Sequence, residues 1–138
     1  MKYLLPVLLF LCIAEAHSNP TSGLSNLKPL EWQNRIIIAN AVEHPQELVK
    51  KFADSAYEMN DRVIIWFIIQ EQQVLTNYAG HIADDFMDNI HKRYQLNPRE
   101  IVLIGKDGGV KSSQNTLDLK AFFSEIDAMP MRIQEMRD

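Results

Sequence analysis

The sequence predicts a mixed α/β domain, in which a small sheet of parallel and antiparallel strands carries helices on both of its faces. Apolar runs at residues 35–39 and 62–69 flank a stretch with helical periodicity. This pattern is typical of a strand–helix–strand unit with parallel strands. Residues 101–111 hold two extended runs around Lys-Asp-Gly-Gly, a strong hairpin signal. An amphipathic helix follows the hairpin.

The composition fits one globular domain. The chain has 138 residues, of which 46% are hydrophobic and 23% are charged, and this is enough for a single core. The net charge of −4 is spread along the chain, and no block of Lys and Arg is present. We therefore expect no nucleic-acid partner, and no membrane attachment once the N-terminal segment has been removed.

The N-terminal 26 residues differ from the rest of the chain. Lys2 precedes an apolar run that ends in Ala-Glu-Ala. Residues 1–16 are therefore expected to be a secretory signal peptide cleaved after Ala16, with an uncleaved anchor as the alternative. The polar residues 17–26 predict a flexible leader, and residues 27–138 a single domain. The protein is then expected to be secreted or periplasmic.

Cys12 is the only cysteine, and it lies within the expected signal peptide. The remaining chain has no thiol, so it can form neither a disulfide nor a thiolate nucleophile. We expect no thiol-based redox activity and no cofactor.

Two helices are expected between the first strand and the hairpin. Residues 44–59 predict one, because a proline suits the first helical turn and Phe52 and Ala56 fall on one apolar face. Residues 81–94 show the clearest helical pattern, with apolar side chains recurring every three or four positions. The polar residues 71–80 before them predict a turn.

A third helix is expected after the hairpin, at residues 119–128, with Asp118 as its N-cap. Pro130 ends this helix, and residues 131–138 can form one or two further turns. The predicted order is β-α-β-α-β-β-α, without repeats or a second domain.

That order resembles the thioredoxin fold, so a thioredoxin-like mixed sheet is expected. Three stretches carry a more specific resemblance: residues 103–111, residues 126–136 with Met-Pro-Met-Arg, and Trp-Gln-Asn-Arg at residues 32–35. They are similar to a secreted, peroxiredoxin-like domain of unknown function, the DUDES type. It occurs alone in bacteria and within vertebrate matrix proteins such as equarin and the sushi-repeat-containing proteins. The resemblance spans residues 27–137 and implies a fold and an extracytoplasmic compartment rather than a reaction.

Two histidine regions are candidate sites. In thioredoxin-like proteins the reactive residue follows the first strand, and here that segment holds His44, which can act as a general base beside an anion-binding helix N-terminus. A solvated cap explains the same residues. His81 and Asp85, four residues apart on a polar helix face, have the side chains that ligate transition metals. A solvated helix face explains their spacing equally well.

The hairpin and the C-terminal tail carry the candidate binding site. The expected binding residues are Lys106, Asp107, Lys111, Asp127, Arg132 and Glu135. If turn and tail lie close together, Lys106, Lys111 and Arg132 form an exposed basic cluster that suits a carboxylate or a phosphate. Turn chemistry alone is the alternative for the hairpin residues. For Arg132 the alternative is that it holds the tail in place.

The sequence therefore predicts an exported, redox-inactive binding module of unknown activity. Its expected partner is an extracytoplasmic protein or an anionic ligand. The alternative is a small periplasmic enzyme or metal-binding protein that uses His44 or the His81–Asp85 face.

Overall fold

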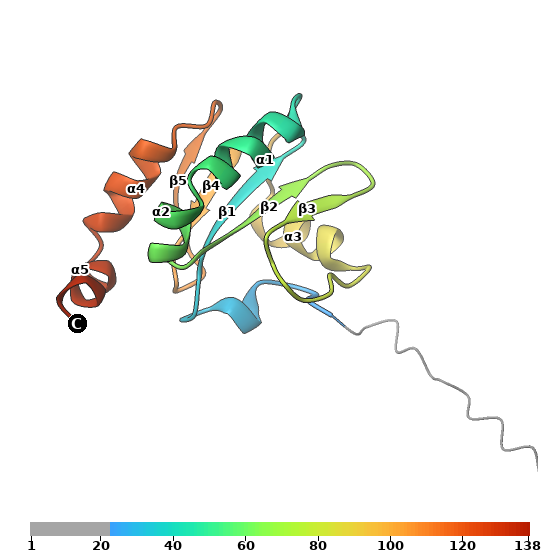
Figure 1. Ribbon diagram of the computed structural model, residues 1–138. Coiled ribbons are helices and arrows are strands. Elements are labelled where there is room, and N and C mark those ends of the chain that lie inside the picture. The colour runs from blue at the N-terminus through green and yellow to red at the C-terminus, as the bar shows by residue number, and fades with distance from the viewer. Residues whose placement is uncertain (1–22) are drawn as a thin grey trace, which may run out of the picture.

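The computed structural model describes residues 23–138 as a twisted sheet with helices on both sides (Figure 1). The expected signal peptide and most of the expected leader lie outside these residues. Five strands form one sheet in the order β3-β2-β1-β4-β5. The predicted mixed α/β class is confirmed.

The central strand is β1 (Arg35–Asn40), whose six residues are all buried. It pairs in parallel with β2 (Ile64–Ile69) and antiparallel with β4 (Ile101–Ile104). β5 (Val110–Gln114) adds to β4 and β3 (Val74–Thr76) to β2, both antiparallel. Burial on both faces explains why the four central residues of β1 are all apolar.

The strand β3 was not predicted, because residues 71–80 were expected to form a turn. Val74, Leu75 and Thr76 pair with the end of β2. A run of three residues is too short to show the alternation that identifies a strand.

One face of the sheet is covered by α1 (Pro45–Asp54), α2 (Ala56–Asp61) and α4 (Leu119–Asp127). Their buried side chains pack on alternate residues of the strands; the largest are Phe52, Met59, Phe122 and Ile126. The N-cap of α4 is Asp118, as predicted, and its carboxylate accepts the N–H of Ala121 at 3.1 Å.

The first predicted helix is in fact two helices. Ser55 interrupts it with φ −107°, and its N–H donates to the carbonyls of Lys51 and Phe52. The expected apolar position Ala56 is exposed, and Met59 is buried instead.

The opposite face carries α3 (Phe86–Tyr94) and the short 3₁₀ helix η1 (Lys28–Leu30). The prediction that α3 begins at residue 81 was wrong. Leu24 donates its N–H to the His81 carbonyl at 2.8 Å, and its own carbonyl accepts the N–H of Ala83 at 3.0 Å. This pairing holds residues 81–83 outside the helix.

The same pairing moves the start of the packed domain. Leu24 is only 3% exposed and lies in the core beneath α3. Within the described residues, the part of the expected leader at 23–26 therefore belongs to the fold, which begins before the predicted boundary at residue 27.

The tail forms α5 (Pro130–Arg137), with an unusual distribution of side chains. Arg132 is buried, whereas Met131, Ile133 and Met136 are exposed. The inner side of α5 is thus charged and the outer side partly apolar, the reverse of a typical surface helix. Within residues 23–138, no helix has both the length and the apolar character needed to cross a membrane.

Candidate functional site

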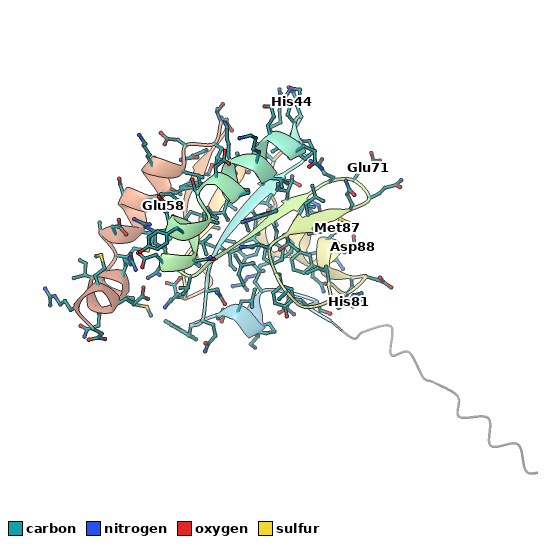
Figure 2. All side chains as sticks on the ribbon, in the orientation of Figure 1. His44, Glu58, Glu71, His81, Met87 and Asp88 are labelled. Carbon is teal, nitrogen blue, oxygen red and sulfur yellow. The ribbon has the colours of Figure 1, made fainter. Side chains whose placement is uncertain are left out.

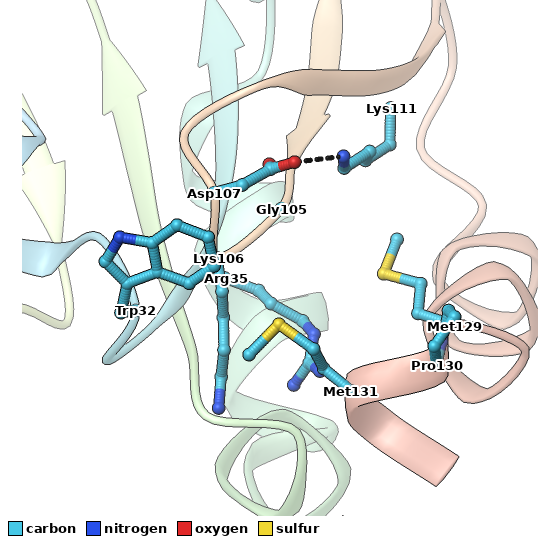
Figure 3. A pocket seen from close by; sticks show the side chains of 9 residues that line it. All are labelled: Trp32, Arg35, Gly105, Lys106, Asp107, Lys111, Met129, Pro130 and Met131. Atoms are coloured by element: carbon cyan, nitrogen blue, oxygen red, sulfur yellow. Dashed lines mark hydrogen bonds and ion pairs between the residues drawn. The ribbon is translucent and has the colours of Figure 1, made fainter. Parts of the chain in front are cut away.

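A pocket of about 220 Å³ lies between the hairpin turn and the start of α5 (Figure 3). The hairpin contributes Lys106, Asp107 and Lys111. Trp32 lies on one side and the residues around Met131 on the other, while Arg35 extends beneath the turn. Segments about 100 residues apart in the chain therefore meet at this pocket.

The shape of the turn depends on its glycines and on Asp107. Gly108 has φ +83°, a conformation that glycine adopts without steric cost. Asp107 accepts the N–H of Gly109 at 3.0 Å with one oxygen and the ammonium of Lys111 at 2.8 Å with the other. The Lys111 ammonium, helped by that N–H, holds the pKa of Asp107 below its usual value.

Gly105 makes room for Lys111. A Cβ at this position would overlap Cε of Lys111, so any larger residue would force the end of the lysine side chain to move. The turn thereby holds an ammonium group at the pocket.

Trp32 is the most unusual residue of the pocket. It is 60% exposed and has φ +66°, and its N–H donates to the carbonyl of Lys106 at 2.7 Å. A left-handed backbone is rare for a bulky residue and costs about 1–3 kcal/mol. Strained backbone of this kind is concentrated at functional sites.

Arg35 supplies a buried guanidinium beneath the pocket. The residue is 1% exposed, and its two terminal nitrogens donate to both oxygens of Glu135 at 3.1 and 3.2 Å. Its Nε is buried and has no acceptor among the described residues. Such an unsatisfied group is uncommon and calls for an explanation.

Glu135 is shared between cations. Besides Arg35, it contacts the ammonium of Lys106 at 2.5 Å and lies 3.8 Å from the guanidinium of Arg132. Burial raises the pKa of Glu135, but the hydrogen bonds from Arg35 and Lys106 outweigh burial and lower it overall. Lys106 was expected to be exposed; its side chain is only 13% exposed because it is paired with Glu135.

Arg132 lies behind the pocket and joins α5 to the rest of the domain. It donates to Asp127 at 3.1 Å and to Asp61 at 2.5 Å through its side chain, and at 2.9 Å to the Asp61 carbonyl. Arg62 makes a bidentate pair with Asp127 at 2.8 and 3.0 Å. These contacts support the alternative in which Arg132 holds the tail.

The pKa values in this group follow the ion pairs. The pKa of Asp127 is lowered chiefly by Arg62, with burial opposing and Arg132 helping. Burial lowers the pKa of Arg132, but the hydrogen bonds to Asp61 and Asp127 outweigh burial and raise it overall. The guanidinium therefore stays charged.

The ion pairs around α5 form two clusters that differ in charge balance. The tail cluster, defined as Asp61, Arg62, Asp127 and Arg132, has two cations and two carboxylates. The pocket cluster, defined as Arg35, Lys106 and Glu135, has two cations and one carboxylate. The neighbouring Lys111–Asp107 pair is balanced. The pocket cluster therefore has one positive charge in excess within its ion pairs, while the Glu31 carboxylate lies nearby against Gly108 of the turn.

The six residues expected to bind do not all lie at the pocket. Lys106, Asp107 and Lys111 line the pocket, and Glu135 lies beneath it. Asp127 and Arg132 belong to the tail cluster and do not line the pocket. Sequence reasoning missed Arg35 and Trp32; the available signal was an arginine at the start of an otherwise apolar buried strand.

The histidine sites have a different outcome. His81 precedes α3 instead of lying on it, so it shares no helix face with Asp85, and Asp85 accepts the hydroxyl of Ser25 at 2.8 Å. His44 lines a second cavity and is well separated from His81 (Figure 2). Within residues 23–138, no three His, Cys, Asp or Glu side chains are grouped in a way that could hold a metal ion. The alternative of a metal-binding helix face at His81 and Asp85 is therefore not supported by where these residues lie.

The fold and pocket define a small mixed α/β domain with a basic pocket beside its terminal hairpin. The chain belongs to the family of the domain of unknown function DUF4174, whose model matches residues 26–135. Comparison with curated proteins and with solved structures gives no match.

Proposed function

We propose that this chain is an exported, redox-inactive binding module on a thioredoxin-like scaffold, and that the pocket binds an extracytoplasmic partner. The strands β2, β1, β4 and β5 support the scaffold assignment. They are adjacent in that order, with β1 and β2 parallel and the other pairs antiparallel, as expected of a thioredoxin-like β-α-β-α-β-β-α chain. β3 is an addition at the edge.

The resemblance to the DUDES type gains support from the position of the residues that carry it. Trp32 and Arg35 come from residues 32–35, Lys106 and Lys111 from residues 103–111, and Met131 from residues 126–136. All five line the pocket. Stretches that pack separately would have no reason to converge in this way.

The observation that carries the binding role is the excess cation beneath an exposed, strained tryptophan. Buried charge without a counter-charge is costly unless a ligand supplies one. The pocket lining consists of cations, a paired aspartate and apolar side chains, with no histidine. These groups suit holding a ligand better than transferring a proton.

Export and the absence of thiol chemistry complete the proposal. Residues 13–138 contain no cysteine, so the chain cannot form a mixed disulfide once the signal peptide is removed. Mass spectrometry of the secreted or periplasmic protein should show His17 as its first residue. An intact Met1 on a cytoplasmic product would contradict export.

Site-specific photocrosslinking tests the binding role. A benzoylphenylalanine at position 32 should capture a partner in the native extracytoplasmic extract. The same residue at position 57 should not, because Tyr57 is 80% exposed but lies on α2, outside the pocket lining. Lys106→Gln should weaken capture at position 32. Equal capture at both positions, or capture unaffected by Lys106→Gln, would refute the pocket as the binding site.

A further inference from the structure

Resting on the binding role proposed above, we infer that the pocket recognises one carboxylate attached to an apolar residue. The ligand is a polypeptide segment of the partner in which an acidic group, on a side chain or at the C-terminus, adjoins an apolar side chain. Charge, donor supply, volume and the surrounding surface each support this class.

The charge at the pocket matches a carboxylate. Arg35 and Lys106 share the single carboxylate of Glu135, leaving one positive charge in excess. A carboxylate carries one negative charge, whereas a phosphate monoester carries nearly two at neutral pH. The same excess disfavours a metal cation at the pocket methionines.

The donors available at the pocket also suit the two oxygens of a carboxylate better than the three terminal oxygens of a phosphate monoester. The N–H groups of Gly105, Gly108 and Gly109 are all used within the turn, so these glycines offer no backbone cradle for a phosphate. Lys106 and Lys111 each use one of three ammonium protons in an ion pair. Arg35 Nε has no acceptor among the described residues, but it is buried from solvent, so a ligand oxygen reaches it only if the neighbouring side chains move.

The volume limits the ligand to a small group. About 220 Å³ is below the roughly 300–1,000 Å³ typical of sites that enclose a whole small molecule. It fits one side chain with its carboxylate, presented by a larger molecule. The walls that would contact the side chain are the Trp32 indole and the methionines Met129 and Met131 (Figure 3). Methionine adapts readily to side chains of different shape.

The surroundings favour a polypeptide. Because the inner face of α5 is occupied by Arg132 and Glu135, Met131 is left 43% exposed at the wall of the pocket. Trp32 is exposed beside the pocket as well. A segment whose carboxylate enters the pocket has apolar surface to contact on leaving it.

Titration of the ¹⁵N-labelled protein with small probes tests the ligand class. The indole N–H signal of Trp32, assigned with Trp32→Phe, should shift saturably with N-acetyl-leucine and with acetyl-Leu-Glu-amide. N-acetyl-leucinamide, which lacks the charge, should bind about tenfold more weakly or not at all. Trp66, stacked on Phe52 with ring centroids 4.9 Å apart, provides an internal control whose indole signal should not move.

The two carboxylate probes distinguish the sources. Preference for N-acetyl-leucine indicates a C-terminus, and preference for acetyl-Leu-Glu-amide indicates an acidic side chain. Lys106→Gln and, independently, Lys111→Gln should each weaken binding about tenfold. Lys50→Gln should not, since Lys50 is an exposed lysine paired with Asp54 on α1.

The remaining outcomes overturn the inference. If inorganic phosphate binds more tightly than the carboxylate probes, or if N-acetyl-leucinamide binds equally well, the ligand is not a carboxylate, although the pocket still binds a ligand. A dimer that forms with increasing protein concentration and displaces the probes would make a second copy the occupant. If no probe binds but crosslinking at position 32 persists, the ligand class is wrong and the binding role stands. If crosslinking also fails, both are wrong.

Discussion

The tail cluster and the pocket cluster are built from the same kinds of side chain but differ in charge balance. In the tail cluster Arg62 and Arg132 meet Asp61 and Asp127, so each charge has a partner. In the pocket cluster one carboxylate, that of Glu135, pairs with both Arg35 and Lys106. A balanced cluster with buried guanidinium groups holds two elements together, whereas an unbalanced one next to a pocket leaves a charge for a ligand. This difference predicts opposite responses to mutation.

The largest effect is expected for Arg132→Met. Removing this guanidinium leaves Asp61 and Asp127 with one cation and detaches α5 from α2. Loss of one partner from a buried pair costs about 3–5 kcal/mol, and the partial exposure of the aspartates reduces this to about 1–3 kcal/mol. Thermal unfolding should show a melting temperature several degrees lower. Arg99→Met, at an exposed pair with Glu43, is the matched control and should change little.

Acid should weaken both clusters. Asp127 and Glu135 have pKa values below their usual range, lowered by Arg62 and Arg132 in one case and by Arg35 and Lys106 in the other. Their contribution to stability is therefore complete above the unfolded-state pKa values of about 4 and is lost as the pH falls below them. Urea unfolding from pH 7 to pH 3 should show this loss. The double variant Asp127→Asn/Glu135→Gln should show a shallower decline; an unchanged decline would mean that other carboxylates control acid stability.

Removing the charge from Lys106 should affect stability much less than Arg132→Met. In Lys106→Gln the remaining Arg35–Glu135 pair is balanced and keeps both hydrogen bonds. We expect less than about 1 kcal/mol of destabilisation, measured by urea unfolding. A loss of stability as large as that of Arg132→Met would show that the pocket cluster also holds the fold together. The two clusters would then not differ in role.

The smallest effect on stability, and the most informative, is expected for Trp32→Gly. Glycine adopts φ +66° without strain, which offsets its larger conformational entropy in the unfolded chain. The free energy of unfolding should stay within about 1 kcal/mol of the original or rise. Binding of the carboxylate probes should be lost, which calorimetric titration measures because the variant has no indole signal at position 32. A strongly destabilised variant would mean that the indole is needed for packing.

Much of the fold could be predicted because it depends on local pattern. The buried strands, the glycine-containing turn and the Asp118 cap all have local signals in the sequence. The start of α3 could not be predicted, since Leu24 overrides a helical pattern from nearly 60 residues away. The break at Ser55 also has no strong signal, because serine is tolerated within helices.

The candidate site was predictable only in part for the same reason. Lys106, Asp107 and Lys111 lie within one turn, and their proximity follows from the hairpin. The pairing of Arg35 with Glu135 joins residues 100 positions apart, and the sequence around either residue gives no sign of it. The positive φ of Trp32 is likewise imposed by the chain around it, through its hydrogen bond to Lys106.

The reversed polarity of α5 has a consequence for how the protein moves. A helix fastened mainly by ion pairs has little apolar surface to bury, so its separation from the domain exposes little that water disfavours. It should open as a unit well below the free energy needed to unfold β1, whose side chains are all buried. Amide protons of α5 should therefore exchange with solvent faster than those of β1. Raising the salt concentration should speed the exchange of α5 selectively, which would make ionic strength a means of loosening the wall of the pocket.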